Sequence, residues 1–82
     1  MKKNGALGVE VENGLECENG WKLSVDGGSE KTFEGKRTSV IGINPGIVSV
    51  QAIGIINGKQ VQDNKPAKIE GGETTIVTLK LE

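Results

Sequence analysis

The chain has 82 residues, ten of them basic and eleven acidic, and its formal net charge is −1. A chain of this length buries only about 60–65% of its unfolded surface, so we expect residues 1–82 to form one domain with a thin core. The balanced charge and the scattered Lys and Arg residues argue against the basic surface that nucleic acid binding needs. We expect residues 1–4 to be frayed.

The residue types exclude most catalytic and metal chemistry. The sequence has no His and only one Cys, so Ser-His-Asp catalysis, Cys-His catalysis and cysteine-cluster zinc sites are all ruled out. Cys17 stands between Glu16 and Glu18, whose charges disfavour the reactive thiolate. We therefore predict that the protein is not an enzyme and has no catalytic residues, metal or cofactor, because so thin a core encloses neither a nucleotide nor a haem.

Hydropathy indicates neither a membrane span nor a signal peptide. No apolar run approaches the 18 or more residues of a spanning helix, and no hydrophobic stretch follows Met1-Lys2-Lys3. The compartment stays open. We expect an extracytoplasmic location if the chain is a domain excised from a longer exported protein, and a cytoplasmic one if it is a complete reading frame.

Glycine and asparagine mark turns at short intervals along the whole chain. Between these turns lie runs rich in Val, Ile and Thr, and no window shows a sustained helical period. Short strands at spacings of roughly 8–12 residues are typical of an all-β sandwich or barrel. We predict a small antiparallel β-sandwich with six to eight strands in two sheets.

Alternation of apolar and polar residues defines three half-buried strands, at Leu7–Val11, Trp21–Val25 and Val77–Leu81. Weaker strands are expected around Phe33 and over Thr38–Ile43. The predicted core anchors share inward-facing positions and are Trp21, Leu23, Val25, Phe33, Val48, Val50, Val77 and Leu79.

Asn57-Gly58 is the strongest hairpin signal, because both residues tolerate the positive φ of a type I′ turn. A two-residue loop pairs Ile56 with Lys59, so the long strand Ile47–Ile56 sends its even-numbered residues into the core. Farther on, we expect a separate extended strand over Ala67–Glu70 that ends at Gly71-Gly72.

The opposite face of this hairpin mixes polar and large apolar side chains, namely Gln51, Ile53, Ile55, Gln60 and Gln62. Two explanations are open. A bulge at Gly54 would switch the register and turn Ile53 or Ile55 inward, which is the more ordinary outcome. Alternatively, the two isoleucines form an exposed apolar strip, and these five residues are an interface.

Four segments in order carry a family resemblance: Gly5–Val9, Val25-Asp26-Gly27, Val40–Val50 around a Pro-Gly turn, and Ile69–Leu79 with its Gly-Glu-Thr start. This order resembles PEGA domains and the related carboxypeptidase-regulatory-like (transthyretin-like) β-sandwiches. The resemblance covers most of the chain. It implies an immunoglobulin-like or transthyretin-like Greek-key sandwich, and a non-catalytic accessory module that spaces domains, packs against them or binds a surface.

Three functions are compatible with these observations. The first is a structural or protein-interaction module of a larger surface or envelope protein, with a neighbouring domain or a second copy as partner. The second is a module that binds carbohydrate or another envelope polymer through the polar loops 13–20 and 63–65, with Trp21 at the rim, although the alternation favours Trp21 as a core residue. The third is a small stand-alone protein that binds or inhibits a partner protein, for example by adding a strand to its sheet. We expect lysines to guard the sheet edges, at Lys22, Lys31, Lys36, Lys59 and Lys80.

Overall fold

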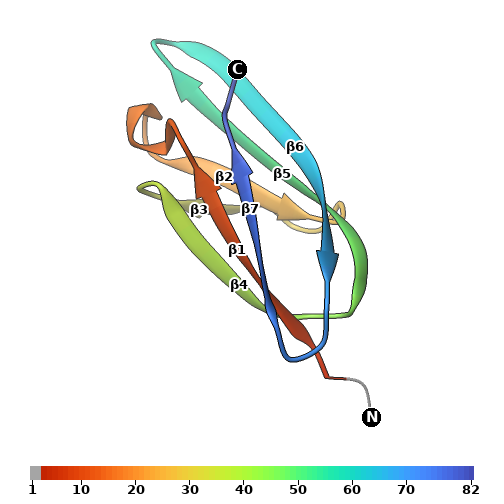
Figure 1. Ribbon diagram of the computed structural model, residues 1–82. Helices are drawn as coiled ribbons and strands as arrows, with labels where there is room; N and C mark the ends of the chain where they lie inside the picture. Colours follow the sequence, from red (N-terminus) through yellow and green to blue (C-terminus); the bar gives the residue numbers. More distant parts are fainter. Residues whose placement is uncertain (1–2) are drawn as a thin grey trace.

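The computed structural model describes residues 3–82 as seven strands and one short 3₁₀ helix (Figure 1). In chain order these are β1 (Gly5–Val11), η1 (Gly14–Glu16), β2 (Trp21–Val25), β3 (Lys31–Phe33), β4 (Arg37–Ile43), β5 (Gly46–Ile56), β6 (Lys59–Ile69) and β7 (Thr74–Leu79). Strand formation follows the high content of β-branched residues, and the turns follow Gly and Asn.

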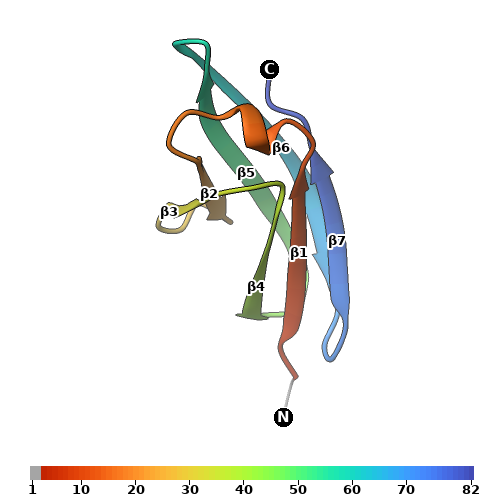
Figure 2. The same ribbon diagram turned by 90° about the vertical axis from the view of Figure 1, so that its left-hand side faces the viewer.

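The strands form two sheets, in the orders β4-β1-β7 and β3-β2-β5-β6, which lie as two layers in Figure 2. The prediction of a small all-β sandwich is confirmed. One pair departs from antiparallel order, because β7 runs parallel to β1, with Val9 beside Val77. The segment Asn44-Pro45 between β4 and β5 carries the chain from one sheet to the other, so it closes no hairpin.

The core lies between the sheets and is built from the alternating positions of each strand. Most predicted anchors are buried, and these are Trp21, Leu23, Val48, Val50, Val77 and Leu79. Val25 and Phe33 are only partly buried, although both pack against the core. The Phe33 ring lies 5.6 Å from the Trp21 ring, at an angle of 42°. The buried indole donates its Nε1–H to the Gly35 carbonyl at 2.8 Å, which satisfies its one polar group.

The hairpin of β5 and β6 has the predicted register throughout. Asn57 and Gly58 both have positive φ, of 53° and 74°, as a type I′ turn requires. Ile56 pairs with Lys59, and the pairing runs without a shift to Gly46 and Ile69. The bulge considered at Gly54 is therefore absent, and Ile53 and Ile55 face outward.

Strand β6 is longer than expected, because it continues through Pro66 to Ile69. The strand expected over 67–70 is present as far as Ile69 but is the end of β6 and not a separate strand, and residues 63–65 are strand residues and not a loop. The reason is the position of Pro66 opposite Ser49 on the outermost strand of its sheet. Backbone groups of β6 alternate in direction along the strand, and at Pro66 the nitrogen points away from β5 to the outer edge of the sheet. No strand of the described residues 3–82 pairs there, so no N–H donor is needed.

After β7 the chain leaves the first sheet and joins the edge of β6. Glu82 exchanges two backbone hydrogen bonds with Gln62, with N···O distances of 3.1 and 3.2 Å. The Asp63 carboxylate accepts from the Lys80 N–H at 3.1 Å. The Asn13 amide accepts from the Leu81 N–H at 3.0 Å and donates to the Leu81 carbonyl at 2.7 Å. Residues 80–82 thus tie the two sheets together at one corner.

Replacing Asn13 with Ala is expected to lower the free energy of unfolding by about 1–3 kcal/mol, because a net contribution of about 0.5–1.5 kcal/mol is typical for each of the two hydrogen bonds lost. Urea unfolding followed by Trp21 fluorescence measures this change. The exposed Asn64 is the matched control, and Asn64→Ala should change stability by less than about 0.5 kcal/mol. Equal effects of the two substitutions would contradict the role of Asn13.

Near its start the chain is held by the turn after β6. The Gly72 N–H donates to the Asn4 carbonyl at 3.1 Å. The expected fraying of residues 1–4 stays a prediction, and residues 1 and 2 lie outside the described residues. Among residues 3–82 no helix is long and apolar enough to cross a membrane.

Candidate functional site

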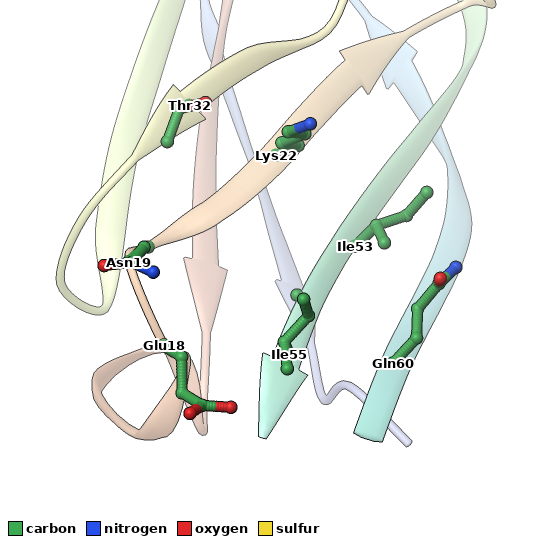
Figure 3. Close-up of a pocket in the computed structure, with 9 residues that line it drawn as sticks. Glu18, Asn19, Lys22, Thr32, Ile53, Ile55 and Gln60 are labelled. Carbon is green, nitrogen blue, oxygen red and sulfur yellow. The ribbon is translucent and has the colours of Figure 1, made fainter. Parts of the chain in front are cut away.

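The outer face of the β3-β2-β5-β6 sheet carries a shallow hollow of about 290 Å³. Strand β5 supplies its apolar floor with Ile53 and Ile55, and Ile55 is 46% exposed. The rim comes from four other segments and consists of Glu18, Asn19, Gly20, Lys22, Thr32 and Gln60. Figure 3 shows the two isoleucines along β5 between Lys22 of β2 and Gln60 of β6.

Strand alternation explains why these side chains share one face. Lys22 pairs with Ile53 across β2 and β5, and Thr32 pairs with Lys22 across β3 and β2. On the other side, Ile55 pairs with Gln60. Cross-strand partners present their side chains to the same face of a sheet. The hollow is therefore a direct consequence of the register that buries Trp21, Leu23 and Val50 on the opposite face.

The loop before β2 forms one wall and is fixed to the end of the hairpin. The Glu18 N–H donates to the Ile55 carbonyl at 2.7 Å, and the Glu18 carboxylate accepts from the Gly58 N–H at 2.9 Å. The Glu18 side chain thus lies next to Ile55 in Figure 3. Because both contacts involve backbone groups, this wall is held at a set distance from the apolar floor.

The core side of the same loop is held by Cys17, whose thiol packs over Gly54. A methyl group at Gly54 would approach the Cys17 Sγ within 2.6 Å and the Leu81 Cδ1 within 3.2 Å. Gly54 is thus a point of close approach on the buried face and does not mark a bulge. Because Gly54 has no side chain, the loop that carries Cys17 can pack closely against β5.

Burial, and after it the neighbouring Glu16 carboxylate, raises the pKa of the Cys17 thiol above its ordinary value of 9.0. We expect iodoacetamide to react more slowly with the folded chain at pH 8 than with the chain in urea, since less thiolate is present. The folded state holds the thiol proton more tightly, so stability should fall as the pH rises above 9. Cys17→Ala should lack that alkaline loss, and a loss of the same size in the variant would contradict the assignment.

The five predicted interface residues all lie on the outer face of this sheet, but only part of the set lines the hollow. Ile53, Ile55 and Gln60 line it. Gln51 and Gln62 lie farther along the face, where their side-chain amides are 3.5 Å apart. Sequence reasoning missed Lys22 and Thr32 as neighbours of Ile53, although Lys22 alternates with the buried Trp21 and Leu23. Glu18 and Asn19 lie in the loop before β2, and no local sequence pattern predicts that this loop packs against β5.

The structure does not support a sugar-stacking role for Trp21. The side chain is 1% exposed and lies on the face opposite the hollow. None of the residues that line the hollow is aromatic. Of the two loops considered for polymer binding, only residues 18–20 reach the hollow. Asp63 and Lys65 are engaged with the backbone of Lys80 and Thr78.

Within residues 3–82 there is no group of three or more His, Cys, Asp or Glu side chains arranged to hold a metal ion. Comparisons with protein-family models, curated proteins and solved structures found no match for this chain. The class of protein that fold and site define is a small β-sandwich with a shallow, aromatic-free hollow on one sheet. The resemblance to PEGA and carboxypeptidase-regulatory-like domains stays a prediction.

Proposed function

We propose that this chain is a non-catalytic protein-interaction module, serving as an accessory or spacer domain of a larger surface or envelope protein. Its docking surface is the hollow around Ile53 and Ile55. The single observation that carries the proposal is the unbroken register of β5, which turns two large apolar side chains outward beside polar neighbours. Apolar surface rimmed by polar residues is typical of protein interaction sites.

The shape of the hollow favours a protein partner over a small molecule. Its volume of about 290 Å³ is at the lower limit of pockets that enclose ligands, which are typically about 300–1,000 Å³. The floor is made by side chains of one strand, so a partner would lie across it and not enter it. An apolar side chain of the partner would cover Ile53 and Ile55, while Lys22, Glu18 and Gln60 offer polar contacts at the rim.

A carbohydrate-binding function has less support, because the hollow lacks an aromatic side chain on which a sugar ring could stack. The test is the fluorescence of Trp21 in the presence of envelope polysaccharides. Buried on the opposite face, Trp21 should give no shift. A saturable shift would favour the polymer-binding function over the protein-interaction function.

The docking test compares two substitutions on one strand. Ile55→Lys places a charge in the hollow, whereas Ile47→Lys changes a 75%-exposed residue of the same strand and the same face but outside it. A protein captured by the wild-type chain from an extract of its source cells is purified and titrated against all three chains. We expect Ile47→Lys to bind like wild type and Ile55→Lys to bind at least tenfold more weakly. Equal affinities for all three chains would refute the hollow as the docking surface.

A further inference from the structure

The edges of the two sheets differ in how they are protected. Strand β6 is covered at its outer edge by residues 80–82, by the Thr75 hydroxyl on the Lys68 carbonyl at 2.7 Å, and by the Lys65 ammonium on the Thr78 carbonyl at 2.8 Å. Strand β3 has only three residues and begins at Lys31. Short strands, edge lysines and covering segments are common ways of blocking edge pairing.

The guarding lysines expected from the sequence do not all lie at edges. Lys22 lies in β2, an interior strand, and points into the hollow. Lys36 precedes β4, and no charged residue follows Arg37 in that strand. The outer edge of β4, from Thr38 to Ile43, therefore has neither charge nor Pro. It also presents Ile41, which is 81% exposed.

The backbone of β4 offers unpaired hydrogen-bonding groups on this edge. The Val11 N–H donates to the Lys36 carbonyl at 2.7 Å, which makes Val11 and Lys36 a hydrogen-bonded pair. Alternation then directs the backbone groups of Thr38 and Val40 toward β1, and those of Arg37 and Ser39 away from it. Within residues 3–82, sheet order places no strand on that side of β4.

We propose that β4 pairs antiparallel with β4 of a second copy of this chain, around Ser39, to form a six-stranded sheet across a two-fold axis. In this register the two Ser39 residues exchange their N–H and C=O bonds, and Val40 faces Thr38 of the other copy. Arg37 faces Ile41, so no like charges stand opposite each other. The two Arg37 residues are about 13 Å apart along the strands, beyond the screening length of about 8 Å at physiological salt.

Two features limit the assembly to a weak dimer. The register of β1 and β4 places Ile41 and Gly42 together opposite Ala6, a bulge that ends the regular edge after a few residues. The area buried by so short a ribbon is at the low end for protein interfaces, so association should depend on concentration. A two-fold contact uses the β4 edges of both copies at once, so neither copy has a second β4 edge to offer. The outer edge of β6 is covered, so the assembly stops at two copies.

The test is the absolute mass in solution across a range of concentrations, by light scattering behind a size-exclusion column. We expect the wild-type chain to rise from the 8.6 kDa monomer toward twice that mass. Ser39→Lys, which sets two lysines face to face at the axis, should stay at 8.6 kDa, and the matched Ser39→Thr should behave like wild type. A wild-type monomer at about 1 mM, or a dimer that survives Ser39→Lys, would overturn the proposal.

Amide exchange of the wild-type chain gives a second test that needs no variant. The Ser39 amide should exchange freely in dilute solution and at least tenfold more slowly in concentrated solution. The Val40 amide, which faces β1, should be protected in both. Free exchange at Ser39 at both concentrations would exclude edge pairing. Because Ile55 lies in the other sheet, a dimer lost only in Ile55→Lys would instead assign self-association to the hollow.

Discussion

Replacing Trp21 with Ala is expected to lower the free energy of unfolding by about 3–5 kcal/mol, the range for removing a buried aromatic residue. The indole is the largest fully buried side chain, and its loss also leaves the Gly35 carbonyl without its hydrogen bond. A chain of this size has a total stability of about 4–12 kcal/mol. The variant should therefore be marginally folded at 25 °C, as followed by circular dichroism in urea.

The neighbouring Lys22 is the matched control for this substitution. It lies in the same strand with its side chain on the solvent face, so Lys22→Ala should change stability by less than about 0.5 kcal/mol. If Trp21→Ala were as mild as Lys22→Ala, Trp21 would not be a core anchor, and its assignment to the buried face would be wrong.

Gly54→Ala is expected to destabilise the chain by about 2–3 kcal/mol, near the upper end for overpacking a core. The added methyl group would meet the Cys17 Sγ at 2.6 Å, and β5 cannot retreat because it is paired with β2 and β6 on its two sides. Urea unfolding followed by Trp21 fluorescence measures the loss.

A double-mutant cycle identifies the cause of that loss. In a Cys17→Ala background the nearest obstacle is removed, so Gly54→Ala should cost at least 1 kcal/mol less than in the wild-type background. Equal costs in the two backgrounds would show that Cys17 does not pack over Gly54, and that the loop at 13–20 sits elsewhere.

Alternation in the sequence was sufficient to predict most of the fold. Leu7, Val9 and Val11 are buried as the pattern requires, and Asn57-Gly58 alone set the register of the longest hairpin. The pattern was insufficient where the cause is not local. We did not predict that β6 continues through Pro66, because a strand tolerates Pro there only when that strand lies at the edge of its sheet. The parallel pairing of β7 with β1 depends on which sheet the chain re-enters after β6.

The candidate site was predictable in its floor and not in its walls. Ile53 and Ile55 were identified as unusual from the sequence, but Gly54 between them suggested a bulge. What Gly54 accommodates is Cys17, 37 positions earlier in the chain, and no short-range signal connects the two residues. The same holds for Glu18, whose carboxylate reaches the hairpin turn at Gly58.

The most direct test of the outward placement of Ile53 and Ile55 is proton nuclear magnetic resonance of the wild-type chain. Non-hydrogen-bonded antiparallel pairs bring their Cα atoms within about 4.5 Å, so their Hα protons give strong cross-strand contacts. An unbulged hairpin predicts such contacts for Gln51 with Asn64, Ile53 with Gln62 and Ile55 with Gln60. A series that breaks or shifts by one residue at Gly54 would turn one isoleucine inward and remove the proposed docking surface.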